Sequence, residues 1–174
     1  ALQSLLNAAE CFFDLRRLIE VVYADEQTLQ TALNSLAEQP EIAAELVPSL
    51  LDLQQKNLGR APRLHQLLQD SLQEAAAASP DSKQPDGAAT EQAVDAVEAE
   101  QQRVQLAEQY LDRAVEQMQL IIEQLALPED ASDQRDERLV QAADLAVTQL
   151  EELRRLYFSL IEHLRDTARR QADL

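Results

Sequence analysis

Apolar residues recur three or four positions apart along most of the chain, which is the spacing of helices. Between residues 91 and 174 the repeat is regular, because one apolar position returns every seven residues and a second lies between. In the first such stripe these residues are Val97, Val104, Leu111, Met118 and Leu125, with Ala107, Ala114 and Ile121 between them. A second stripe has Leu139, Ala146, Leu153 and Leu160, with Ala143, Leu150, Tyr157 and Leu164 between them. This pattern predicts two long helices that pack through their stripes.

A short polar turn separates these two helices. Pro128 follows the first stripe, and Ser132 and Asp133 precede the second. Because a short connection returns the second helix beside the first, we expect an antiparallel, coiled-coil-like hairpin over 91–174. Val115 and Ile122 lie beside the first stripe and need further cover. We therefore expect more helices alongside, supplied either by residues 1–78 or by a second copy of the chain.

Residues 1–78 have apolar residues at helical spacing in shorter runs and predict a group of about four short helices. Pro48 should bend or break the third helix, and Gly59 should end it in the left-handed conformation. Prolines, a glycine and small polar residues in 79–90 predict a polar linker. The sequence thus predicts an all-α helical bundle with a long C-terminal antiparallel hairpin. The expected short helices span 2–23, 25–39, 40–57 and 62–78.

Composition supports this fold and excludes several function classes. Of the 174 residues only 3% are aromatic and 2 are glycine, so the chain has few of the residues that strands and tight turns require. A net charge of −17 opposes binding to nucleic acid and direct binding to an anionic membrane surface. Two glycines cannot form a glycine-rich phosphate loop, so we expect no nucleotide cofactor bound in that way.

Catalytic and metal-binding residues are not indicated by the sequence. The chain has 2 His and 1 Cys, which give no zinc pattern. A carboxylate-bridged metal site in a bundle uses Glu three residues before His, but Pro62 precedes His65 and Leu160 precedes His163 at that spacing. Cys11, next to an aromatic pair, is interpreted as a buried residue. We therefore predict no catalytic residue, no cofactor and no metal site, and a protein that is not an enzyme.

The predicted function is protein interaction or assembly, because long apolar stripes and surplus apolar surface accompany no catalytic motif. Phe158 and His163 lie off the stripe of the last helix, and Tyr110 flanks the first stripe. We predict that these three residues contribute to a surface that binds a protein partner or a second copy. The alternative is a sensory bundle that binds a small molecule between its helices. Its pocket would be lined by Phe12, Phe13, Tyr110 and Tyr157.

The start of the chain bears on its cellular context. Ala1 is not an initiator Met, and no signal peptide follows it, so Ala1 is either a processed end or, as we interpret it, the cut edge of a larger protein. Membrane segments outside this sequence would then tether the protein. A single cysteine suits a reducing compartment without excluding the periplasm. Both the cytoplasm and the cell envelope therefore stay open.

Residues 153–165, with the sequence LRRLYFSLIEHLR, carry a family resemblance. This segment resembles one in uncharacterised bacterial helical proteins that occur beside MoxR-type ATPases and von Willebrand factor A-domain proteins of the aerotolerance type. The resemblance is confined to the C-terminal part of the chain and includes no catalytic motif. It implies a helical component of an envelope-associated ATPase and A-domain system. This sequence contains neither an ATPase motif nor an A-domain metal motif, so neither activity is implied.

Overall fold

The computed structural model describes residues 14–38, 43–78, 87–127 and 134–172, without the side chains near several helix ends, including those of 87–97 and 158–172. All secondary structure in these ranges is helical, which confirms the predicted all-α class. The helices are α2 (Leu15–Glu38), α3 (Ala43–Ala78), α4 (Gly87–Ala126) and α5 (Arg135–Ala172).

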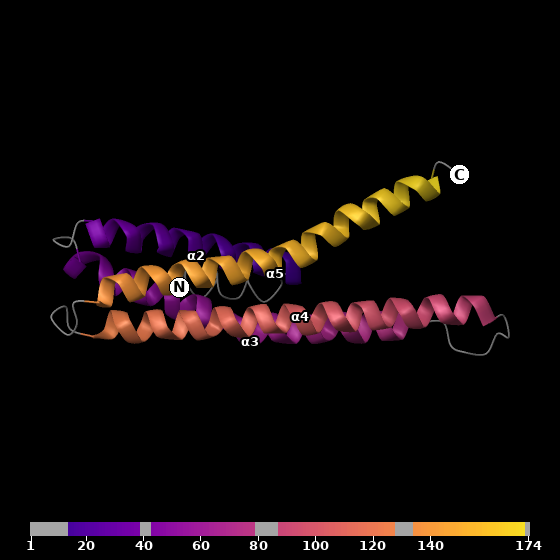
Figure 1. The fold of residues 1–174 in the computed structure, drawn as a ribbon, viewed down its shortest axis with the longest axis horizontal. Helices are drawn as coiled ribbons and strands as arrows, with labels where there is room; N and C mark the ends of the chain where they lie inside the picture. Colours follow the sequence, from indigo (N-terminus) through magenta and orange to yellow (C-terminus); the bar gives the residue numbers. More distant parts are fainter. Residues whose placement is uncertain (1–13, 39–42, 79–86, 128–133, 173–174) are drawn as a thin grey trace, which may run out of the picture.

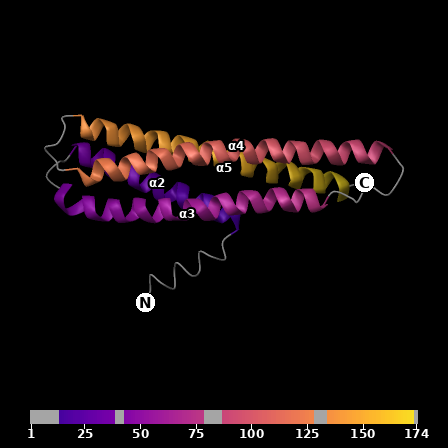
Figure 2. The same cartoon turned by 90° about the horizontal axis from the view of Figure 1, so that it is seen from below.

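The four helices form a bundle in which each helix runs antiparallel to the next one along the chain (Figure 1). α4 packs against α3 and α5, and α2 packs against the same two helices on the other side (Figure 2). The antiparallel hairpin predicted for 91–174 is therefore present. Its additional cover comes from α2 and α3 of the same chain.

The prediction of short helices in the N-terminal part is wrong for the described residues. Leu15–Glu38 and Ala43–Ala78 form two long helices, α2 and α3. α2 passes without a break through the boundary expected near Asp25, and α3 continues through Pro48, Gly59 and Pro62. Gly59 has no positive φ and does not end the helix. Each proline removes one backbone donor, but the apolar stripe of α3 stays buried on both sides of Pro62, at Ala61 and Leu64, and this packing outweighs the loss.

The predicted polar linker also has a different end. α4 begins at Gly87, so the last four residues of the predicted 79–90 linker belong to a helix. Residues 79–86 lie outside the described residues. The end moves because Gly87–Thr90 precede an alanine-rich run that favours helix, so α4 extends past the polar residues.

The core consists of two apolar clusters arranged along the bundle. The first contains Leu18, Leu68 and Leu111, and the second contains Leu33 and Ile121. Every described residue of the two predicted stripes is buried, from 104 to 125 and from 139 to 157. The predicted register of the hairpin is therefore confirmed within the described side chains.

The C-terminal part of α5 diverges from the bundle. Figure 1 shows α3 and α4 continuing side by side while α5 turns away from both toward its end at Ala172. None of the described helices combines the length and apolar character needed to cross a membrane. The bundle therefore has one closely packed half and one half in which α5 stands apart.

Candidate functional site

A layer of buried polar side chains interrupts the core between α2 and α3. Glu26, Gln54 and Asn57 are each 0% exposed, and Arg60 is 6% exposed. On α2, Glu26 lies between Val22 of the first apolar cluster and Leu29 of the second. The polar layer, which we define as Asp25, Glu26, Gln54, Asn57 and Arg60, thus separates the two clusters.

Hydrogen bonds connect most of the polar layer across the two helices. Asn57 Nδ2 donates to Glu26 Oε1 at 3.2 Å, and Arg60 Nη1 donates to Asn57 Oδ1 at 2.6 Å. The same Arg60 nitrogen lies 2.7 Å from Asp25 Oδ2, which makes an ion pair. α2 and α3 are therefore joined by one continuous polar chain from Glu26 to Asp25.

Part of the polar layer lacks hydrogen bonds. Glu26 Oε2 and both polar atoms of the Gln54 side chain are buried and have no hydrogen-bond partner of normal geometry among the described residues. Burial raises the pKa of Glu26 from 4.5 to about 7, although polar contacts from Asn57 and Gln54 oppose the rise. Because Gln54 lowers this pKa without a hydrogen bond of normal geometry, its amide lies near the carboxyl but is not aligned with it.

Two arginine and tyrosine pairs lie on the sides of the bundle. Arg154 of α5 lies over the Tyr23 ring of α2, 5.3 Å from the centroid, and its Nε donates to Glu20 Oε1 at 2.6 Å. Arg103 of α4 lies 5.6 Å from the centroid of the Tyr157 ring. Burial raises the pKa of Tyr157, although the Arg103 charge opposes this. The two pairs connect α5 to α2 and to α4.

Arg135 closes the opposite end of the bundle. Its side chain is buried at the start of α5, where Nε donates to the Gln124 carbonyl at 2.8 Å and Nη2 to the Leu125 carbonyl at 3.3 Å. These carbonyls belong to the last turn of α4, where backbone acceptors have no partner within the helix. The positive charge also suits the negative end of the α4 dipole. Arg135 therefore caps α4 and joins its end to the start of α5.

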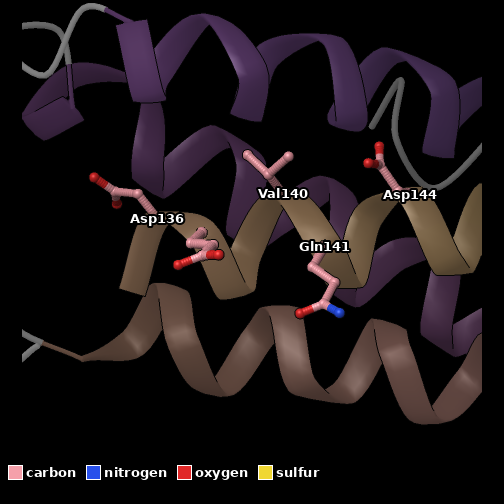
Figure 3. Close-up of a pocket in the computed structure, with 5 residues that line it drawn as sticks. Asp136, Val140, Gln141 and Asp144 are labelled. Carbon is pink, nitrogen blue, oxygen red and sulfur yellow. The ribbon is translucent and has the colours of Figure 1, made fainter. Parts of the chain in front are cut away.

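A shallow surface hollow of about 410 Å³ lies on the outer side of α5 (Figure 3). Its lining comes from one helix, and its labelled carboxylates, Asp136 and Asp144, are spread along that helix without converging on a common point. Asp144 also accepts a hydrogen bond from Gln30 of α2 at 2.7 Å. No group of three or more side chains among the described residues is placed to hold a metal ion. The hollow is lined by Asp136, Glu137, Val140, Gln141 and Asp144.

The residues predicted from the sequence fall in different environments. Tyr110 is half-buried and packs against the first apolar cluster, which gives it a role in packing. The backbone of α5 passes through Phe158 and His163, but their side chains lie outside the described ones. Their contribution to a binding surface stays a prediction. Of the residues expected to line a ligand pocket, Tyr157 is buried in the first cluster, and Phe12 and Phe13 are outside the described residues.

The polar layer was missed by the sequence analysis, although a signal for it exists. Glu26 follows Val22 by four residues and precedes Leu29 by three, so it occupies the apolar stripe of α2. The helix predicted to begin at residue 25 instead places Glu26 at a helix start rather than in the middle of an apolar stripe. Comparisons with protein-family models, curated proteins and solved structures gave no match. Function is therefore inferred from the bundle itself.

Proposed function

We propose that this chain is a non-enzymatic assembly domain that binds an amphipathic helix of a partner protein along the C-terminal part of α5. The observation that carries the proposal is the divergence of this part of α5 from α3 and α4 (Figure 1). The sequence continues its apolar repeat there with Leu160 and Leu164. An apolar stripe on a segment that diverges from the other described helices favours association with another helix.

The charge of this segment indicates the chemistry of the partner. The chain carries a net charge of −17, but its diverging part is not acidic. In 158–172 the charged residues are Glu162, Arg165, Asp166, Arg169 and Arg170. A partner helix with acidic residues beside its apolar stripe would complement these arginines. The acidic remainder of the chain would repel the same helix, which directs it to this segment.

Binding of a synthetic amphipathic peptide tests the proposal. A peptide with acidic residues beside a leucine stripe should bind at least about tenfold more tightly than one with the same stripe and basic residues. Fluorescence anisotropy of labelled peptide would give both Kd values. Equal binding of the two peptides, or binding of neither, would contradict the proposed chemistry.

Phe158→Ala should weaken binding of the acidic peptide by about tenfold while leaving the helical circular dichroism nearly unchanged. The matched control is Leu145→Ala, because Leu145 is 42% exposed on α5 within the closely packed half of the bundle. If both variants bind like the parent protein, Phe158 is not part of the surface. The same pair of variants, measured by light scattering after gel filtration, would show whether a second copy occupies the site.

The resemblance of 153–165 indicates which native proteins to test first. Helical proteins with a similar segment occur beside MoxR-type ATPases and von Willebrand factor A-domain proteins. Crosslinking of the purified chain to such candidates, with Phe158→Ala in parallel, would identify a specific partner by loss of the crosslink. The alternative function is a sensory bundle. It predicts instead that a small metabolite raises the melting temperature of the parent protein and of the Phe158→Ala variant equally.

A further inference from the structure

Glu26 occupies an unusual position because its carboxyl is fully buried yet only half paired. Oε1 accepts one hydrogen bond, from Asn57, while Oε2 has no partner of normal geometry among the described residues. The Gln54 side chain is also fully buried, and neither of its polar atoms has a hydrogen-bond partner of normal geometry among the described residues. An ionised carboxylate needs several donors when it is removed from water. This site provides one aligned donor, Asn57, and the nearby Gln54 amide, which also lowers the pKa of Glu26 without an aligned hydrogen bond.

Among the described residues no side chain makes a hydrogen bond of normal geometry to Oε2 of Glu26. On α2 its neighbour Asp25 is acidic and makes the carboxylate less favourable. On α3 the Arg60 Nη1 atom is directed to Asp25 and Asn57. α5, the other helix packed on α2, contributes Asp144 and Arg154.

Those α5 residues contact other side chains of α2. Asp144 accepts a hydrogen bond from Gln30, and Arg154 is paired with Glu20. Among the described residues of α4 and α5, the buried polar side chains are Gln124 and Arg135, which lie together at the hairpin turn. The side chains that act on the Glu26 carboxyl are Asn57 and Gln54 through polar contacts and Asp25 through its charge.

We propose that the Glu26 carboxyl is a proton-operated latch that holds α2 against α3. When protonated, it keeps the bond from Asn57 and donates its own proton to the Gln54 amide oxygen, which completes the polar layer. When ionised, it leaves a buried negative charge with a single aligned donor, between two apolar clusters. The lower-energy arrangement then has α2 moved off α3, so that water reaches the carboxylate.

The direction of the effect follows from the raised pKa of Glu26. Because this pKa rises from 4.5 when exposed to about 7 in the folded bundle, folding favours the protonated carboxyl. The closed latch is fully stabilised below pH 4.5 and loses that stabilisation as the pH rises through about 7. Over this window the equilibrium constant for opening should increase on the order of a hundredfold.

Hydrogen exchange tests the latch in the intact chain. Exchange of the α2 backbone amides, corrected for its intrinsic dependence on pH, would be followed from about pH 5 to about pH 9. The opening of α2 near Glu26 should increase across neutrality, while amides of α4 near Leu111 keep their protection. Opening of all helices together would mean that the charge acts on global stability, and would overturn the proposal of a local latch.

Glu26→Gln provides the decisive variant, because the amide keeps the shape of the protonated carboxyl and cannot ionise. Its α2 amides should stay protected at high pH, to the degree that the parent protein shows at low pH. Glu116→Gln, an exposed change on α4, is the matched control and should keep the parental dependence on pH. A Glu26→Gln protein that still opens with rising pH would overturn the proposal.

A carbon-13 titration of the Glu26 carboxyl in the parent protein keeps the test valid even if the variant does not fold. The proposal requires the same midpoint for the titration of this carboxyl and for the opening of α2. A midpoint near the ordinary value of 4.5 for an exposed glutamate would refute the latch.

Discussion

At the scale of single residues, the polar layer lowers the stability of the bundle but makes the alignment of its helices specific. A buried polar atom without a partner costs about 1–3 kcal/mol, so Glu26 and Gln54 reduce the stability of the bundle. In return, their neighbours Asn57 and Arg60 make bonds to α2 that exist in one helix alignment only. Purely apolar surfaces would tolerate a slip of one helix along the other. We infer that the polar layer sets the alignment of α2 on α3.

Arg60→Met should destabilise the protein by about 2–4 kcal/mol, because it leaves Asp25 and Asn57 without their donor while keeping most of the apolar bulk. Urea unfolding followed by circular dichroism would measure the change. Arg63→Met offers a control three residues further along α3, because Arg63 Nη1 donates a hydrogen bond to the exposed Gln66 side chain. Similar losses for the two variants would argue against the special role of Arg60.

At the scale of elements, α3 shows that local helix-breaking residues act only where packing permits. Pro48 and Pro62 lie inside the helix, and Gly59 keeps helical geometry between them. Glycine in a helix is unfavourable because the unfolded chain loses more freedom there than at alanine. α3 therefore carries three weak positions that its buried side compensates.

Gly59→Ala should stabilise the protein by about 0.5–1 kcal/mol. The position is exposed, and a Cβ built there meets nothing within 4 Å, so the alanine adds no collision. A rise in the urea midpoint with an unchanged slope would confirm the expectation. A lower midpoint would show that α3 needs flexibility at Gly59.

The element scale also shows what could be predicted from the sequence. The stripes from Val104 to Leu125 and from Leu139 to Tyr157 predict both helices of the hairpin, because a seven-residue repeat admits one helix face only. The continuity of α3 could not be predicted in this way. The helix-breaking tendency of proline and glycine is read from the local sequence, whereas the burial of Leu64 depends on the other helices of the assembled bundle. The polar layer depends on α2 meeting α3, a pairing that no local pattern specifies.

At the scale of the whole molecule, the two apolar clusters make stability a shared property of all four helices. Leu111 is 0% exposed and belongs to the first cluster, which combines residues of α2, α3, α4 and α5. A defect at this point cannot be confined to one helix pair.

Leu111→Asp should cost about 3–5 kcal/mol, because an unpaired carboxylate would be placed in the apolar core. Leu106→Asp is the matched control on the same helix, since Leu106 is 36% exposed. It should change stability by less than about 1 kcal/mol. Thermal unfolding of both variants would make the comparison, and equal melting temperatures would mean that the register of α4 is wrong.

The order in which the helices pack also affects how fast the chain folds. Each helix contacts the one that follows it in sequence, and α2 with α5 is the one adjacent pair that joins the two ends of the described chain. Contacts between sequence neighbours close small loops, and proteins built from them fold in microseconds to milliseconds. We expect the hairpins to form rapidly and independently. The docking of α2 on α5, which closes the longest loop, should then set the folding rate.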